Sequence, residues 1–152
     1  MELRKKIDKI LGTTLTIIMG LMVVNVLWQV FSRFVLASPS SFTDELSRYL
    51  MIWVGILGAA YVSGRNMHVA IDVVPLKTGP ATQKKLRIFV FLLVIIFALA
   101  AMVVGGSRLV YISFTLGQTS PALQIPLAFV YAVIPVSGIL IVYYKITDLL
   151  SA

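Results

Sequence analysis

The sequence predicts an all-α membrane protein of four transmembrane helices, with both chain ends on the cytoplasmic side. Hydrophobic residues make up 59% of the 152 residues and charged residues only 12%, whereas a soluble domain carries about 25% charged residues. A soluble chain of this length could not bury so much apolar surface, but lipid can surround it. The number of helices and their orientation follow from the long uncharged stretches and from the basic residues that flank them.

The first predicted span covers residues 10–31, which is longer than the roughly 20 residues that a bilayer requires. Basic residues precede it, as in a signal peptide, but its uncharged stretch exceeds the roughly 7–15 residues of a signal core. We therefore expect a helix that is retained. Its deepest polar residues, Asn25 and Gln29, lie four apart. Hydrogen bonds to a neighbouring helix are the favoured interpretation, and contact with a substrate is the alternative.

The second predicted span covers residues 42–63. Ser41 precedes Asp44 by three residues and Glu45 follows, which is typical of a helix start. Asp44 precedes Arg48 by four residues and Glu45 precedes it by three, and both spacings allow an ion pair on a helix. An acid on the amino-terminal side of the base is the favourable order. This charge cluster either fixes the start of the helix or contacts a partner at the outer face, and the sequence leaves both interpretations open.

The segment 64–83 is polar, is broken by glycine and proline, and is expected to form a cytoplasmic loop. Within it, residues 67–76 form either a short helix in the membrane plane or an irregular loop. His68 and Asp72 lie four apart and would share one helical face. Ordering of this loop is favoured over a direct functional role for the pair.

The third predicted span covers residues 84–114, with Arg108 marking the far end of its uncharged part. The apolar run that follows cannot be a single helix, because glycine, polar residues and Pro126 interrupt it. The fourth predicted span therefore covers residues 126–146. Pro135 lies inside this span and is expected to kink it.

The basic residues indicate the orientation. With the amino end inside, ten of them lie on the cytoplasmic side and three outside, which together account for all 13. The inner ten are Arg4, Lys5, Lys6, Lys9, Arg65, Lys77, Lys84, Lys85, Arg87 and Lys145. The outer three are Arg33, Arg48 and Arg108. This bias follows the positive-inside rule.

Small residues spaced by four could let helix backbones approach closely, either inside the bundle or against a partner. The second span carries Gly55, Ala59 and Ser63 at this spacing, and Pro126 and Pro135 are further candidates for helix packing. The same spacing recurs in the other spans, at Gly12, Thr16 and Gly20 and at Ala101 and Gly105. Trp53 belongs to the aromatic residues near span ends, which are typical of membrane interfaces.

No chemistry of its own is expected from this chain. It has no cysteine and one histidine, which excludes disulfides and bis-histidine haem and disfavours a metal site. No catalytic motif is present, and we expect neither enzymatic activity nor a bound cofactor. None of the uncharged span cores holds an ionisable residue of the kind that transport pathways use. The composition favours an accessory subunit over its alternatives, a self-sufficient four-helix transporter or a membrane anchor of a cofactor-bearing enzyme.

Two blocks of sequence carry a family resemblance. The first comprises Glu45-Leu46-Ser47-Arg48-Tyr49, Trp53, Gly58-Ala59-Ala60, Arg65, His68-Val69 and Asp72. The second comprises Ser120-Pro121-Ala122-Leu123, Ile125-Pro126, Tyr131 and Ile134-Pro135. In this order, and with four spans, the chain resembles the small membrane subunit of tripartite ATP-independent periplasmic (TRAP) transporters, the DctQ family.

The resemblance implies a large DctM-type partner subunit in a bacterial inner membrane, which holds the substrate and sodium sites and moves like an elevator. A periplasmic binding protein would deliver an organic anion: a C4-dicarboxylate, sialic acid or another sugar acid. The small subunit would brace the fixed scaffold, help to dock the binding protein, and bind no nucleic acid. Residues expected to contact partners or to support the structure are Asp44, Glu45, Arg48, Trp53, His68 and Asp72.

Overall fold

The structure is a computed structural model, and it describes residues 2–36, 40–65 and 80–150. In these ranges the regular elements are helices, apart from an isolated bridge between Thr119 and Pro126. Four helices are long and apolar enough to cross a membrane. The predicted class, an all-α protein with four membrane-spanning helices, is therefore confirmed.

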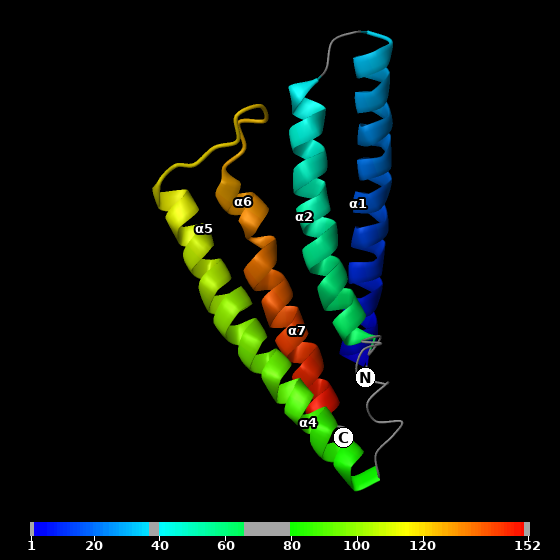
Figure 1. The fold of residues 1–152 in the computed structure, drawn as a ribbon, viewed down its shortest axis with the longest axis vertical. Helices are drawn as coiled ribbons and strands as arrows, with labels where there is room; N and C mark the ends of the chain where they lie inside the picture. The colour runs from blue at the N-terminus through cyan, green and yellow to red at the C-terminus, as the bar shows by residue number, and fades with distance from the viewer. Residues whose placement is uncertain (1, 37–39, 66–79, 151–152) are drawn as a thin grey trace.

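The first two helices, α1 (Glu2–Phe34) and α2 (Ser41–Gly64), run side by side in opposite directions (Figure 1). The basic segment before the first predicted span is part of α1 and extends it toward the amino end. The start of α2 corrects a prediction. The N-cap is Ser40, one residue before the expected Ser41, and its side chain accepts the Thr43 N–H at 3.5 Å.

The third and fourth spans are each built from consecutive helical segments. The third joins α4 (Pro80–Phe97), the π-helix η2 (Ala98–Gly105) and α5 (Gly106–Thr115). The fourth joins α6 (Leu127–Tyr131) and α7 (Val133–Leu150). The helix is interrupted at Ala132, between α6 and α7. Pro135 follows within one turn and has no N–H to donate to the Tyr131 carbonyl; the kink expected there stays a prediction.

The helices stand in a row, in the order α1, α2, α6–α7 and α4–α5 (Figure 1). One end of the row carries the α1–α2 connection and the segment between α5 and α6, and is called the loop end here. The other end carries both chain termini and is called the terminal end. α7 lies in the middle of the row and packs against α2 on one side and against α4 and η2 on the other.

Three glycines that the sequence analysis did not single out lie where two helices approach closely. A Cβ atom on Gly138 would lie 2.7 Å from the Met102 Cβ and 3.2 Å from a backbone nitrogen, which is too close. Gly106 faces Ile134 and Pro135 in the same way, and Gly64 faces the ring of Tyr144. Glycine at these positions therefore lets the third and second spans pack directly against α7.

The predicted packing residues of α2 differ in burial. Ser63 is buried, but Gly55 and Ala59 are exposed, and a Cβ atom on Gly55 would meet nothing within 4 Å. These two residues therefore do not serve the internal bundle, and contact with a partner stays a prediction. Pro126 is exposed at the start of α6, whereas Pro135 packs against Gly106.

We predict that Gly138→Ala destabilises the bundle by about 1–3 kcal/mol, since the added methyl group must push η2 away from α7. Thermal unfolding of the detergent-purified chain would measure this as a lower Tm. Gly55→Ala is the matched control, because its methyl group would enter open space. Equal Tm values for the two variants would contradict the close approach at Gly138.

Candidate functional site

Apart from the exposed Arg108, which lies seven residues before the end of α5, the charged side chains of the described helices lie toward the two ends of the bundle. Four stretches between them contain no Asp, Glu, Lys or Arg: residues 10–32, 49–64, 88–107 and 127–144. Two polar networks, one at the loop end and one at the terminal end, are therefore the candidate sites.

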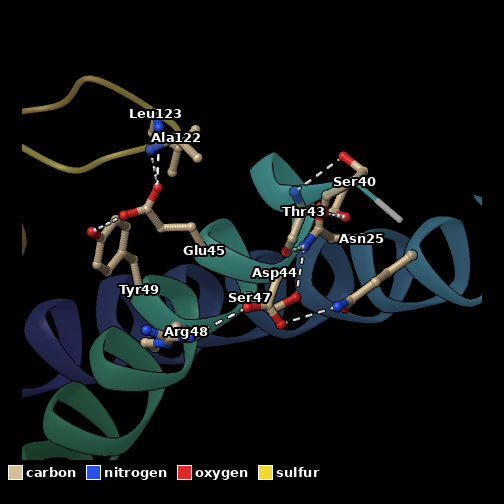
Figure 2. A network of polar contacts seen from close by, with 11 residues as sticks. Asn25, Ser40, Thr43, Asp44, Glu45, Ser47, Arg48, Tyr49, Ala122 and Leu123 are labelled. Atoms are coloured by element: carbon tan, nitrogen blue, oxygen red, sulfur yellow. Dashed lines mark hydrogen bonds and ion pairs between the residues drawn. The ribbon is translucent and has the colours of Figure 1, made fainter. Parts of the chain in front are cut away.

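At the loop end, Glu45 ties α2 to the segment between α5 and α6. Its Oε2 atom accepts the backbone N–H groups of Ala122 at 2.8 Å and Leu123 at 3.1 Å. Its Oε1 atom accepts the hydroxyl of Tyr49 at 2.6 Å. Figure 2 shows the carboxylate pointing away from α1 and toward this segment. Hydrogen bonds to an ionised acceptor are among the stronger ones, so Glu45 acts as a clamp.

The segment that Glu45 holds, residues 118–126, is also ordered by its own hydrogen bonds. Ser120 is completely buried, and its backbone N–H donates to the Ile125 carbonyl at 2.9 Å. The Leu127 N–H donates to the Gln118 carbonyl at 2.9 Å. Gln124 adopts a positive φ of 56°, which is unfavourable for a residue other than glycine. The segment is therefore held in a conformation that includes one residue with an unfavourable backbone angle.

The other two members of the predicted charge cluster face solvent. Asp44 and Arg48 form an ion pair at 3.2 Å with the expected spacing of four residues. Asp44 also accepts a hydrogen bond from Gln29 of α1 at 3.1 Å. The prediction of one compact cluster is wrong for Glu45, which points to the other side of α2 because the α5–α6 segment offers it two N–H donors.

Asn25 joins α1 to α2 in the interior of the loop end (Figure 2). Its side-chain amide donates to the Thr43 carbonyl and to the Ser47 hydroxyl, both at 2.7 Å. The favoured interpretation of Asn25 and Gln29 as interhelical hydrogen-bonding residues is thereby confirmed. Both N–H groups of the Asn25 amide are used in these bonds, and Gln29 uses one of its two for Asp44.

At the terminal end, two cations bind the last carbonyl groups of α2. Lys145 is 1% exposed and donates to the Ser63 carbonyl at 3.1 Å, and Arg4 donates to the Gly64 carbonyl. Both cations share the carboxylate of Asp148, with N–O distances of 3.4 Å for Lys145 and 2.7 Å for Arg4. Cations at the carboxyl end of a helix are favourable, because unpaired carbonyl groups make this end partly negative.

A second contact at this end joins the first and last helices. The hydroxyl of Tyr144, a fully buried residue of α7, donates to the carboxylate of Asp8 in α1. Sequence reasoning did not single out Asp8 or Asp148, and it treated Arg4 and Lys145 only as topology signals. The available signal was an acid close to basic residues at each end of the chain: Asp8 among four basic residues, and Asp148 three residues after Lys145.

The remaining candidates do not add a site. Trp53 is half-buried and packs against the apolar core cluster that includes Leu11, Ile18 and Leu57, so it supports the bundle. His68 and Asp72 lie outside the described residues. Within the ranges that the structure describes, no group of three His, Cys, Asp or Glu residues is placed to hold a metal ion.

Comparisons with known proteins agree on one family. The family model for the DctQ component of tripartite ATP-independent periplasmic transporters matches residues 22–152. A putative TRAP transporter small permease protein of Haemophilus influenzae is 30% identical over 145 residues, which cover 95% of this chain and 88% of the relative.

Two longer relatives match over part of their length. The sialic acid TRAP transporter permease protein SiaT of Haemophilus influenzae is 31% identical over 64% of this chain and 16% of the relative. The isethionate TRAP transporter permease protein DctMQ of Oleidesulfovibrio alaskensis is 31% identical over 74% of this chain and 18% of the relative. In both, the matched segment is a small part of a much longer polypeptide.

We predict that Glu45→Ala frees the segment 118–126, because the N–H groups of Ala122 and Leu123 lose their shared acceptor. Hydrogen–deuterium exchange of a peptide from this segment should become about tenfold faster or more. Asp44→Ala is the matched control, since the neighbouring acid does not contact the segment. Unchanged exchange in the Glu45 variant would contradict its role as a clamp.

Proposed function

Because the chain belongs to the DctQ family and is therefore a small permease subunit of a TRAP transporter, we propose that it pairs with a large DctM-type subunit for sodium-coupled uptake of an organic anion. The family and the four apolar helices make it a multi-pass inner-membrane protein and not an enzyme. We further propose that the terminal end faces the cytoplasm and the loop end faces the periplasm.

The observation that carries this proposal is the absence of charge from the middle of the described helices. A transport pathway for an anion or a sodium ion needs polar or charged groups deep in the membrane. Here the buried charged groups lie near the two ends, and Glu45, Lys145 and Asp148 are engaged with other parts of the chain. Such a bundle is suited to brace a moving partner, which itself holds the substrate and the sodium ions.

The longer relatives support the pairing with a large subunit. Each contains a segment similar to this chain within a polypeptide several times longer, and each is described as a permease protein. A segment of this kind can therefore work while joined to a larger membrane protein. In this chain we propose that the same association forms without the covalent link.

The substrate class follows from the chemistry of the relatives' substrates. Sialic acid is a carboxylate and isethionate is a sulfonate, and both are organic anions at neutral pH. We propose the same class for this transporter, with C4-dicarboxylates and other sugar acids as further members. Selection among them would lie in the large subunit and the binding protein, because this chain offers no free buried cation for an acid group among its described side chains.

A periplasmic binding protein would meet a polar surface at the loop end. Asp44 and Arg48 are 59% and 66% exposed, and Arg33 is exposed close by on α1. Exposed charges suit contact with a soluble protein that must bind and leave repeatedly. The alternatives, a self-sufficient four-helix transporter and an anchor for a cofactor-bearing enzyme, lack comparable support from any described feature.

Uptake in cells tests this function. We expect cells that lack their own system to accumulate a labelled organic anion only when this chain, the large subunit and the binding protein are produced together. Accumulation should require a sodium gradient. Cells with the large subunit and the binding protein but without this chain are the control, and full uptake in that control would contradict the proposal.

A further inference from the structure

At the terminal end, α1 and α2 expose basic side chains that no described acid neutralises. These side chains are Lys5, Lys6, Lys9 and Arg65. None of them forms an ion pair or a side-chain hydrogen bond with a described residue. Of the two acids in the same part of α1, Glu2 forms no ion pair in the described structure, and Asp8 accepts the hydroxyl of Tyr144. This part of the surface therefore carries a net positive charge.

The packing of α1 against α2 gathers three of these cations. Gly12 of α1 lies against Tyr61 of α2, since a Cβ atom on Gly12 would lie 3.5 Å from the Tyr61 hydroxyl oxygen. Lys9 and Lys5 precede Gly12 by three and seven residues, so they lie on the same side of α1, about 5 and 10 Å nearer the terminal end. In the antiparallel α2, Arg65 follows Tyr61 by four residues, and its guanidinium carbon lies 4.9 Å from the centre of the Tyr61 ring. We call Lys5, Lys9 and Arg65 the basic cluster.

The basic cluster lies at the level expected for phospholipid headgroups. Lys9 directly precedes the uncharged stretch of α1, and Arg65 directly follows the uncharged stretch of α2. The fourth span indicates the same level, because its uncharged stretch ends just before Lys145, which donates to the Ser63 carbonyl. Three neighbouring helices therefore agree on where the hydrocarbon core ends.

Tyr61 places a hydrogen-bond donor beside the basic cluster. Its half-buried ring packs against the apolar core cluster that includes Leu11 and Leu57, which holds it in place. Its hydroxyl makes no hydrogen bond with any described residue. A tyrosine with an apolar body and a free polar tip is typical of the membrane interface. The hydroxyl is thus available to a ligand that the three cations attract.

The chemistry of the basic cluster favours a lipid phosphate over a protein as its ligand. Lysine and arginine gathered beside a membrane span attract anionic lipid, whereas protein interfaces are depleted in lysine. Phosphate groups surround a membrane protein at this level, so no further chain is needed to neutralise the cluster. The loop end differs, because its exposed acid Asp44 already pairs with Arg48.

We propose that Lys5, Lys9, Arg65 and Tyr61 form a binding site for one anionic phospholipid between α1 and α2 at the terminal end. The three cations bind the phosphate oxygens, and the Tyr61 hydroxyl donates a hydrogen bond to one of them. The acyl chains extend into the hydrocarbon core beside the two helices. Neither the large subunit nor a transported anion takes part, so the site does not depend on the proposed function.

Native mass spectrometry of the detergent-purified chain tests this site. Phosphatidylglycerol would be titrated, with phosphatidylethanolamine of the same acyl chains and no net charge as the comparison. We expect phosphatidylglycerol to bind about tenfold more tightly or more. The double substitution Lys9→Gln and Arg65→Gln should abolish this preference. Lys84→Gln with Lys85→Gln is the matched control, because it removes two exposed cations of α4 at the same end, and it should keep the preference.

Equal binding of the two lipids by the unsubstituted chain would overturn the site. An equal loss in both double variants would also overturn it, since attraction would then depend only on overall charge. The Tm of the lipid-free Lys9 and Arg65 double variant should match that of the unsubstituted chain, because both side chains are exposed. If this variant lost the large subunit on co-purification but still preferred phosphatidylglycerol, the surface would belong to a protein and not to a lipid.

Tyr61→Phe separates the hydroxyl from the cations. We expect it to weaken phosphatidylglycerol binding severalfold without lowering the Tm of the lipid-free chain, because the ring keeps its packing. Unchanged binding in this variant would contradict the hydrogen bond assigned to Tyr61.

Discussion

The cost of placing a charge in hydrocarbon is the constraint on which the rest of this structure depends. An ionisable side chain in the middle of a membrane span must find a partner or a water-filled cavity. The described helices avoid this cost by keeping their middle stretches free of charge and by placing acids and bases at the two ends. Where such a group is buried, as Glu45, Lys145 and Asp148 are, the chain supplies its hydrogen-bonding partners.

These partners also hold the bundle together. At the loop end, Glu45 fixes the α5–α6 segment on α2. At the terminal end, Arg4, Lys145 and Asp148 join α1 and α7 to the carboxyl end of α2. Between the ends, Gly106 and Gly138 bring the third span against the fourth. Polar contacts at both ends and close packing between them produce a stiff unit, which is the property that a brace for a moving partner needs.

The sequence was sufficient to predict the features that depend on the bilayer and on the local spacing of residues. Hydropathy indicated four helices because a span must be long and apolar, and a separation of four residues indicated the Asp44–Arg48 pair. It did not predict the partners of Glu45, which lie 77 and 78 residues away, or the pairing of Arg4 with Asp148. Only the packing of the helices decides these contacts. Likewise, the spacing of Gly55 and Ala59 did not reveal that they face away from the bundle, because small residues are common on every face of a membrane helix.

Solute flux into liposomes measures most directly whether the chain braces a transporter or transports by itself. Liposomes would contain the purified chain alone or together with the large subunit. The binding protein and the labelled substrate would be added outside, where the sodium concentration would be higher than inside. We predict no uptake above that of empty liposomes for the chain alone, and uptake when the large subunit is present. Sodium-driven uptake by the chain alone would contradict it.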